Sequence, residues 1–393
     1  MLINFSVENF KSIDDLITFS MTLANDGDLK RKNVIDFESI ELLKFAVIYG
    51  ANASGKTNLL EAISFSRAII EKSFLVKDFS YAYNRNSEEN KTRKTKFEYD
   101  ILIDDRIYSY GFSMILNEER ICDEWLYDVT EEEIEIFTRT VGEIYSINED
   151  YLSYNKENLE RLNIYIKDIE NNENILLLTS LNENKRVLED ERGKHIFLDI
   201  YRWFKYNLLI LSSDLRDDKI LTYHDRDYLE KLASFLNEND TGIKEVGLRK
   251  IDKRTIDFSV IEKKTLKNTI IMELKKENGF YQAILKDNDR IYSFIYENGE
   301  IEIYELLFYQ NNNKIPFSYR EQSDGTKRLV DIYSIIYNKR KKTFILDEID
   351  KNLHPLVTCN FVLSFLNNDI FSQLIVTSHE DKILELGDRK SVV

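Results

Sequence analysis

Short apolar runs separated by polar turns dominate the first 120 residues and predict a region made mainly of strands. Residues 43–49 form an apolar run that ends at a glycine, which is typical of a buried central strand. Residues 97–103 and 107–112 predict two further strands that a short acidic turn connects. The helix-forming residues 58–63 interrupt this pattern once. We therefore expect a strand-rich region that contains one helix.

The next part of the chain has a different pattern. From about residue 125 to 240 the sequence is acidic and helix-like, for example at residues 159–170 and 185–205. The apolar run 208–211 predicts one strand within this stretch. This part is therefore expected to be mainly helical.

Strands return in the last third of the chain. Between about residues 245 and 318 short segments alternate, including residues 270–274 and 301–306. The final stretch alternates helix, strand, helix and strand, and its two strands are expected at residues 343–347 and 374–377. Such alternation is the mark of a parallel α/β sheet.

These patterns predict an α/β fold in which both chain ends form one domain. Its first part is expected at residues 1–120 and its second part at residues 301–393. Residues 121–300 are expected to form a mixed helical and β insertion between them. No internal repeat and no linker rich in Pro, Gly or Ser marks the boundaries, so they rest on the change of hydrophobic pattern alone.

The formal net charge of −16 argues against a surface that coats DNA uniformly, because such binding depends on Lys and Arg neutralising phosphates. Local basic patches and solvated loops among many acids both remain open as interpretations of the basic clusters. These clusters lie at residues 30–32, 91–96, 249–254 and 339–342.

The composition is that of a globular protein, with 43% hydrophobic and 32% charged residues. No apolar run approaches the roughly 20 residues of a membrane-spanning helix, and the first residues read as a strand rather than a signal peptide. The two cysteines, Cys122 and Cys359, are far apart and have no partner at metal-ligand spacing. We expect a cytoplasmic protein that does not bind a membrane.

Residues 50–57 fit the pattern G-x-x-x-x-G-K-[ST] at every fixed position, after an apolar strand and before a helix. Such a loop points its N–H groups at a β-phosphate, where the helix N-terminus adds partial positive charge. Lys56 is expected to reach the β- and γ-phosphate oxygens of ATP, and Thr57 to hold Mg²⁺. An ordinary glycine turn is the alternative, but strand, loop and helix all coincide with the complete motif. The expected nucleotide-binding residues here are Gly50, Ala51, Asn52, Ala53, Ser54, Gly55, Lys56, Thr57 and Asn58.

Two acids follow the predicted strand at residues 343–347, at the carboxyl end where α/β sheets bind ligands. Asp347 is suited to orienting the ligand shell of Mg²⁺, and Glu348 to polarising an attacking water as general base. The alternative is that the acids only cap the next turn. Their occurrence together with the phosphate loop favours the catalytic interpretation.

His379 comes directly after the last predicted strand and about 31 residues beyond Glu348. A lone histidine is usually structural. Here its place at the end of an adjacent strand favours contact with the γ-phosphate. His195 and His224 have no such context and are interpreted as surface or packing residues.

In order and spacing these motifs resemble the RecF/SMC-like branch of ABC ATPases. The likeness is greatest to stand-alone AAA-type bacterial ATPases related to the overcome-lysogenization-defect nucleases and to antiphage, abortive-infection ATPase subunits. Residues 3–13 are similar to the family's first strand and the turn that follows it, and residues 50–58 to its phosphate loop. Residues 321–328 resemble the signature motif, and residues 347–355 the carboxylates with the following D-loop. Residues 240–243 resemble a recurrent element of the insertion. The resemblance implies an ABC-type P-loop nucleotide-binding domain.

The signature segment has a physical logic of its own. Ser323 and the N–H groups of Gly325 and Thr326 lie where a helix is expected to begin, which makes an anion site. In a single ABC subunit that site is too far from its own phosphate loop. The resemblance therefore implies a head-to-tail homodimer in which Ser323 of one chain completes the γ-phosphate site of the other. Asp350 would communicate across that interface.

The first functional hypothesis is an ATPase subunit of a bacterial antiphage system, in which ATP-driven dimerisation controls a separate effector such as a nuclease or a toxin. It rests on the resemblance. The alternative is a RecF-like ATPase that closes on DNA during repair, for which the charge of −16 is less favourable. A transporter ATPase is disfavoured by the departure from a Leu-Ser-Gly-Gly-Gln signature. A metal-dependent nuclease acting alone would need a second acid or histidine cluster, which the sequence does not offer.

Overall fold

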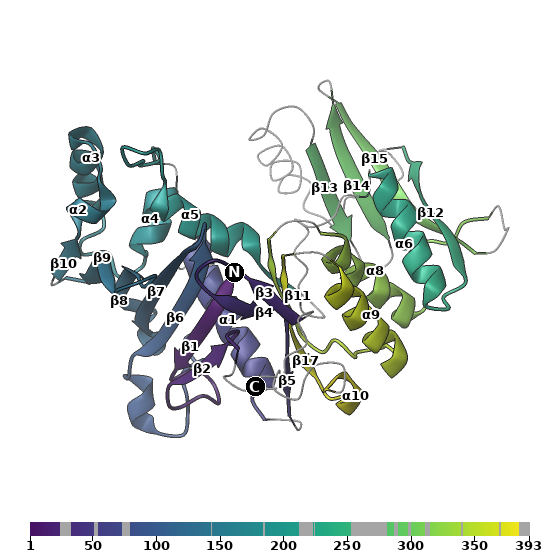
Figure 1. Cartoon of the computed structure of the whole chain (residues 1–393), viewed down its shortest axis with the longest axis horizontal. Coiled ribbons are helices and arrows are strands. Elements are labelled where there is room, and N and C mark those ends of the chain that lie inside the picture. The colour runs from purple at the N-terminus through teal and green to yellow at the C-terminus, as the bar shows by residue number, and fades with distance from the viewer. Residues whose placement is uncertain are drawn as a thin grey trace. The chain divides into compact units, whose positions relative to one another are not determined.

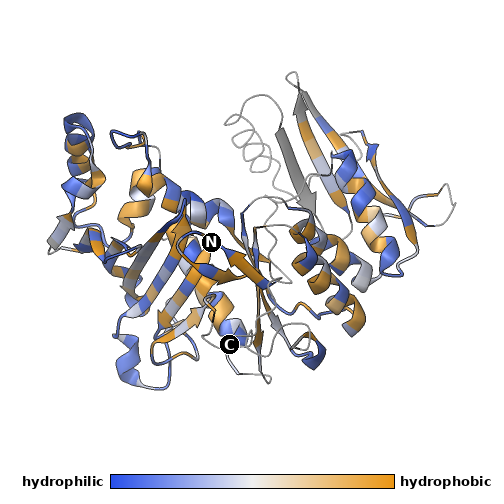
Figure 2. Ribbon diagram, in the orientation of Figure 1, coloured by the Kyte–Doolittle hydropathy of each residue, from blue (hydrophilic) through white to orange (hydrophobic). Residues whose placement is uncertain are grey.

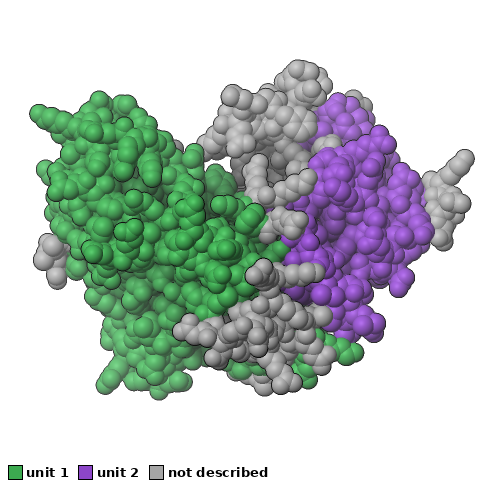
Figure 3. Space-filling model, in the orientation of Figure 1, with its two compact units in different colours: residues 1–215, 340–349, 369–393 green, residues 216–339, 350–368 purple. Residues whose placement is uncertain are grey.

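The structure is a computed structural model in which the chain falls into two compact units, drawn in green and purple in Figure 3. The first unit comprises Met1–Leu215, Arg340–Ile349 and Asp369–Val393, and the second comprises Arg216–Lys339 and Asp350–Asn368. The residues described are 1–23, 33–50, 54–72, 79–142, 144–183, 185–211, 223, 225–252, 281–286, 290–297, 300–310, 315–338, 341–368 and 371–384.

The larger sheet of the first unit is antiparallel and, over the residues described, has the strand order β10-β9-β8-β7-β6-β1-β2 (Figure 1). Bands of hydrophobic and hydrophilic residues alternate along its strands, as expected where one face is buried (Figure 2). The strands predicted at residues 97–103 and 107–112 lie in β6 and β7. The bounds are β1 Leu2–Glu8, β2 Ile17–Ser20, β6 Thr95–Ile103, β7 Arg106–Ile115, β8 Arg120–Asp128, β9 Ile134–Thr140 and β10 Ile144–Ile147.

The second sheet of this unit is parallel and brings distant segments together. In the described part of the chain its order is β11-β16-β17-β5, formed by Leu208–Leu211, Thr343–Leu346, Gln373–Ser378 and Phe45–Tyr49. Every residue of β16 and β17 is buried, which explains why both strands read as continuous apolar runs. The prediction of an α/β fold is confirmed, and both chain ends contribute to this sheet. The central position predicted for the strand at residues 43–49 is wrong, because β5 lies at the edge of the sheet over the described residues; its burial alone explains the apolar run.

The helix that follows β5 is α1, Lys56–Lys72, and it buries Leu59, Ile63 and Ile70 among others. Arg67 on α1 donates hydrogen bonds to the carbonyl oxygens of Phe204 (2.9 Å) and Lys205 (3.3 Å). Both acceptors lie in the π-helical turn Trp203–Asn207, which leads directly into β11. The helix after the phosphate loop is thereby tied to the segment that enters the parallel sheet.

The predicted boundary between residues 120 and 121 falls at the start of β8, a strand of the larger sheet. The role of residues 121–300 as an insertion remains a prediction. Further helices of the first unit are α2 Glu149–Leu152, α3 Lys156–Lys167, α4 Leu177–Asn182, α5 Ile196–Arg202 and α10 Asp381–Leu384. The strands β3 Val34–Asp36 and β4 Glu41–Leu43 pair with each other, and 3₁₀ turns occur at Glu88–Lys91 and Leu116–Glu118.

The prediction of a helix over residues 185–205 is wrong for residues 185–195, because α5 begins only at Ile196. The cause is a local turn at Asp190. The carboxylate of Asp190 accepts hydrogen bonds from the N–H groups of Arg192 and Lys194, both at 2.8 Å. An aspartate that bonds to the backbone two residues ahead competes with helix formation.

The second unit packs helices with an antiparallel sheet whose described strands have the order β12-β15-β14-β13. The helices α6 and α8 are joined through aromatic side chains: Tyr333 lies 5.3 Å from Tyr228 and 5.1 Å from Phe235 between ring centroids. The strand predicted at 301–306 lies in β15, and the one at 270–274 lies outside the described residues. The bounds are α6 Arg226–Glu238, β12 Ile243–Lys250, β13 Tyr281–Lys286, β14 Ile291–Glu297, β15 Glu300–Gln310, α8 Asp324–Tyr337 and α9 Pro355–Asn367. In the part of the chain that the structure describes, no helix is both long and apolar enough to span a membrane.

Candidate functional site

The phosphate-loop motif lies between β5 and α1, as the sequence predicts, although Ala51, Asn52 and Ala53 lie outside the described residues. Gly55 has a φ of +95°, a conformation that side chains with a Cβ rarely adopt. A Cβ at Gly50 would come within 2.7 Å of Ser54 Oγ. The backbone therefore requires a glycine at position 55, whereas a side chain at position 50 would displace that of Ser54.

Two side chains at the start of α1 are placed differently. Lys56 is buried, and its ammonium donates a 2.6 Å hydrogen bond to the carbonyl oxygen of Gly50, at the other end of the loop. Thr57 is exposed. The loop thus combines a lysine ammonium, a helix N-terminus and glycines that allow a tight turn of the backbone. Together these groups fit a phosphate.

The carboxylate pair follows β16 directly. The buried hydroxyl of Thr377 donates to Asp347 Oδ1 at 2.5 Å and accepts the N–H of Glu348 at 2.8 Å. The N–H of Asp347 donates to the carbonyl of Leu211 at 3.2 Å, on the neighbouring strand β11. One side chain on β17 thus holds the carboxylate of Asp347 and the backbone of Glu348. Glu348 has a φ of +49°, an uncommon conformation for a residue with a side chain, and such residues cluster at functional sites.

The strand register brings the predicted groups to one edge of the sheet. In this parallel sheet, β17 lies between β16 and β5, with Leu346 opposite Val376 and Ser378 opposite Tyr49. The first residues beyond these strands are the two acids, His379 and Gly50. All of them therefore leave the same carboxyl edge, where α/β sheets bind ligands. His379 is exposed there.

The segment after His379 is also held at this edge. The N–H of Glu380 donates to Ser378 Oγ at 2.9 Å, and the Tyr49 hydroxyl donates to the carboxylate of Asp381. The hydrogen bond to Asp381 raises the pKa of Tyr49, because the carboxylate stabilises the neutral phenol. The neutral phenol of Tyr49 thus links the end of β5 to the turn that carries His379.

The signature residues and Asp350 belong to the second unit. Ser323 is the N-cap of α8: its hydroxyl accepts the N–H of Thr326 at 3.2 Å and lies 2.9 Å from the Thr326 hydroxyl. The N–H of Thr326, expected in an anion site, is thus already bonded within the cap. A Cβ at Gly325 would lie 3.0 Å from the carbonyl oxygen of Asn352, so α8 and the loop after Asp350 approach closely.

Two residues that the sequence did not single out support this site. Thr377 could have been noticed as a hydroxyl residue two positions before His379 on a strand beside the acids. Ser12 accepts a 2.6 Å hydrogen bond from the amide of Asn58, which the sequence assigned to nucleotide binding. Nothing in the local sequence around Ser12 predicts that contact, since 46 residues separate the partners.

Known structures with similar architecture include three heads of SMC proteins, all at low similarity. The SMC head bound to the C-winged helix domain of ScpA is 13% identical, with a TM-score of 0.44, and covers 100% of this chain and 96% of that one. The SMC head domain from Thermotoga maritima is 12% identical, with a TM-score of 0.37, covering 98% and 92%. The head with an extended coiled coil bound to the C-terminal domain of ScpA derived from Pyrococcus furiosus is 15% identical, with a TM-score of 0.39, covering 100% and 94%. Similarity at this level supports no functional conclusion.

No curated protein sequence matches the chain significantly. A family model does match, and it spans residues 45–385, from β5 through the phosphate loop and the carboxylate pair to the residues after His379. The prediction of an AAA-type ATPase related to abortive-infection proteins is thereby confirmed. The chain belongs to the family described as AAA domain, putative AbiEii toxin, Type IV TA system.

Proposed function

We propose that this chain is an ABC-type ATPase that binds Mg²⁺–ATP at the carboxyl edge of its parallel sheet and hydrolyses it as a homodimer. The observation that carries the proposal is the bridge made by Thr377. Its hydroxyl forms hydrogen bonds with the Asp347 carboxylate and with the N–H of Glu348. The pairing of β17 with β5 places Gly50 at the same edge. A phosphate loop and two acids on one edge are the parts that phosphoryl transfer to water requires.

Each group has a role that its placement supports. Lys56, now bonded to the Gly50 carbonyl, would move its ammonium to the β- and γ-phosphate oxygens. The exposed Thr57 hydroxyl and the Asp347 carboxylate would hold Mg²⁺, which neutralises charge on the phosphates when bound. Glu348 would accept a proton from the attacking water. His379, exposed at the end of β17, would contact the γ-phosphate.

The proposed homodimer rests on the resemblance of residues 321–328 to the ABC signature motif, which in that family completes the nucleotide site of a partner chain. Ser323 is exposed at the N-terminus of α8 and bears a hydroxyl that could reach an anion, while Gly325 provides an N–H in the first turn. We propose that Ser323, Gly325 and Thr326 of one chain complete the γ-phosphate site of the other chain, and that Asp350 contacts the partner there.

The biological role that we propose is control of a separate effector, a nuclease or a toxin, in an antiphage system. The description of the family names a putative toxin of a toxin–antitoxin system, which supports a role in such a system. The separate effector is proposed from the resemblance to antiphage ATPase subunits. ATP-dependent closure of the dimer would change the surface that the effector contacts. ATP shifts the equilibrium between the open and the closed dimer only if it binds the closed dimer more tightly.

A complementation experiment tests the composite site. Lys56→Ala removes the phosphate-binding ammonium, and Ser323→Arg places a bulky cation at the tip of α8. Each variant alone is expected to lose turnover, while Ser323→Arg still binds ATP. When the two are mixed, half of the dimers contain both chains and one complete site, so turnover should recover to about a quarter of the wild-type value.

The mixture separates two questions. A mixture as inactive as either variant overturns the composite site but leaves ATP binding in one chain intact. A wild-type protein that neither binds nor hydrolyses ATP overturns the ATPase proposal itself. Lys72→Ala is the matched control, since Lys72 is an exposed lysine at the other end of α1 and should leave turnover unchanged.

The effector is tested by purifying tagged Glu348→Gln protein with ATP and Mg²⁺ from its native host. The Lys56→Ala/Glu348→Gln double variant, which should not bind ATP, is the control. A nuclease or toxin present at stoichiometric amounts with the single variant only would support control of an effector. DNA without a protein partner would contradict it and favour a RecF-like role in DNA maintenance.

A further inference from the structure

The turn between β1 and β2 has an unusual backbone. Asn9 and Lys11 both have left-handed φ values, 54° and 50°, although neither is a glycine. Each such residue costs of the order of 1 kcal/mol, and the conformation persists only where its surroundings fix it. Strain of this kind collects at functional sites, so the contacts of this turn are informative.

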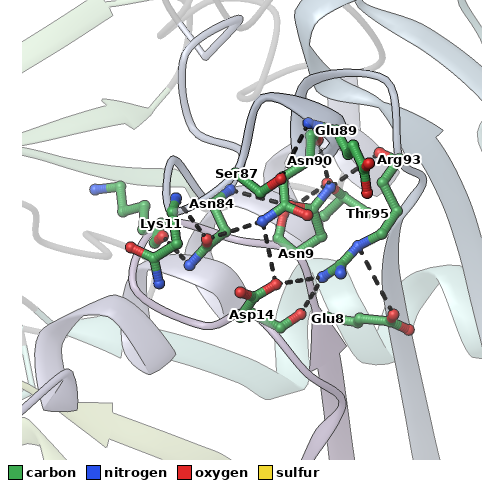
Figure 4. Close-up of polar contacts among 11 residues, drawn as sticks. Glu8, Asn9, Lys11, Asp14, Asn84, Ser87, Glu89, Asn90, Arg93 and Thr95 are labelled. Atoms are coloured by element: carbon green, nitrogen blue, oxygen red, sulfur yellow. Dashed lines mark hydrogen bonds and ion pairs between the residues drawn. The ribbon is translucent and has the colours of Figure 1, made fainter.

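A buried polar network holds the turn in place (Figure 4). The side chain of Asn9, which is fully buried, donates to the carbonyl oxygens of Asn90 and Arg93, both at 2.9 Å. Its own oxygen accepts the N–H of Asn84 at 3.1 Å. The hydroxyl of Thr95 donates to the carbonyl of Asn9 at 2.8 Å. The conformation of Asn9 is thus fixed by residues 84–95.

The backbone of Lys11 is fixed from both sides. Its N–H donates to the carbonyl of Ala82 at 2.7 Å, and its carbonyl accepts the side-chain amide of Asn84 at 3.0 Å. Asn90 and Arg93 also bond to the carboxylate of Asp14, at 3.1 Å and 2.9 Å, which closes the other end of the turn (Figure 4). Little freedom is left for the residues between Asn9 and Asp14.

Three consecutive residues of this turn contact one face of α1. The ring of Phe10 lies 5.7 Å from that of Phe65, Lys11 forms an ion pair with Glu61, and Ser12 accepts a hydrogen bond from Asn58 at 2.6 Å. The helix residues are spaced by three and four positions, so they form a single stripe. The turn therefore contacts α1, the helix that begins at the phosphate loop, from Asn58 to Phe65.

Ser12 is the member of this set nearest to the phosphate loop. A Cβ placed on Gly55 would lie 3.2 Å from Ser12 Oγ, tighter than ordinary van der Waals contact. Ser12 is exposed, so its hydroxyl contributes little to the packing of the core. Its contacts are with the last glycine of the loop and with the amide of Asn58 in the first turn of α1.

We propose that Ser12 is a positioning residue of the nucleotide site, which acts through Asn58 to hold Gly55 and the first turn of α1 in the geometry that receives the phosphates. This inference rests on the proposed binding of ATP at residues 50–58. The strained turn supplies a fixed point outside the loop itself. The N–H groups of Gly55 and of the first turn of α1 then need less ordering when a phosphate binds, which favours binding.

A double-mutant cycle with ATP binding as the readout tests this role. Ser12→Ala removes the acceptor of the Asn58 amide, and we expect ATP to bind about 3- to 10-fold more weakly, the range that one lost hydrogen bond gives. Because Ser12 acts through Asn58, the Ser12→Ala/Asn58→Ala double variant should bind ATP no more weakly than Asn58→Ala alone. Ser12→Thr, which keeps the hydroxyl, should restore binding.

Two comparisons separate this role from a structural one. Asp15→Ala, at an exposed position three residues further along, should bind ATP as the wild type does. The melting temperature of Ser12→Ala should stay close to that of the wild type, since the turn is held by Asn9 and Asn84. Wild-type affinity in Ser12→Ala, or losses that multiply in the double variant, would overturn the proposal.

Failure of the proposed function gives a different result. If the wild type binds ATP and Lys56→Ala does not, the nucleotide site stands whatever Ser12 does. If neither protein binds ATP, the proposed function falls and the positioning role falls with it.

Discussion

The carboxyl edge of the parallel sheet and the beginning of α8 were both predicted as parts of one site, but they are built differently. At the sheet edge, charged side chains are fixed by neighbours: Lys56 by the Gly50 carbonyl and Asp347 by Thr377. At α8, a serine cap and a close backbone approach at Gly325 shape a helix N-terminus. In the proposed mechanism the first region supplies the groups that hydrolyse ATP, whereas the second only completes the site. Substitutions in the two regions should therefore differ in size and in kind.

The largest effect is expected from Glu348→Gln at the sheet edge. Glutamine keeps the shape of the side chain and its left-handed backbone but cannot accept a proton from water. Turnover should fall by at least about 100-fold, the usual contribution of a general base, while ATP binding is retained. Steady-state phosphate release and nucleotide binding measure the two quantities. Glu230→Gln, at an exposed position on α6, is the control. Wild-type turnover in Glu348→Gln would remove the hydrolytic role from this edge.

An intermediate effect is expected from Thr377→Val, which keeps the volume of the side chain and removes the hydroxyl that bridges the two acids. We expect turnover to fall about 10-fold and the requirement for Mg²⁺ to rise, because Asp347 loses its alignment. The free energy of unfolding should drop by about 1–3 kcal/mol, since buried polar groups lose a partner. A Mg²⁺ titration of turnover and thermal unfolding measure these changes.

The control for this variant lies in the same sheet. Thr343, at the amino end of β16, is also fully buried, and its hydroxyl donates to Gln373 at 2.9 Å. Thr343→Val should therefore destabilise the fold to a similar degree and leave the Mg²⁺ requirement unchanged. Equal effects of both substitutions on Mg²⁺ dependence would mean that Thr377 acts on stability alone.

The smallest effect is expected at α8. Gly325→Ala places a Cβ 3.0 Å from the carbonyl oxygen of Asn352, which must shift by a few tenths of an ångström. If this shift moves the α8 N-terminus away from the γ-phosphate of the partner chain and raises the barrier to hydrolysis by about 1 kcal/mol, turnover falls about 5-fold. ATP binding should not change. Gly247→Ala is the control, because among the described residues its Cβ would meet Tyr309 at an ordinary 3.5 Å. A loss of ATP binding in Gly325→Ala would break the distinction between the two regions.

The sequence predicted the parts of the site that are local motifs. The phosphate loop, the two acids after β16 and the α8 cap at Ser323 each depend on residues within a few positions of one another, and the structure places each at the end of the expected element. Which residues bind ATP or Mg²⁺ remains a prediction. The strand at residues 208–211 was also expected, but its pairing with β16 was not, because the partners lie over 130 residues apart.

The residues that sequence analysis missed act across the fold. Thr377 meets the acids from a neighbouring strand, and Ser12 meets Asn58 across a turn held by residues 82–95. Such contacts depend on strand register and on backbone conformations that no local pattern encodes. The error over residues 185–195 has the opposite cause: helical periodicity was given more weight than the turn-forming carboxylate of Asp190.

The order of strands in the parallel sheet has a consequence for how the protein is made. Within the described residues, β5 is an edge strand whose neighbour is β17, and Phe45 pairs with Leu374, 329 positions later in the chain. At a synthesis rate of about 5–20 residues per second, roughly 15 to 65 seconds pass between the synthesis of β5 and that of β17. During that time the phosphate loop has a strand before it but no sheet around it. A nascent chain therefore cannot acquire its nucleotide site until synthesis has nearly reached His379, and an apolar strand stays open to chaperones or to wrong partners until then.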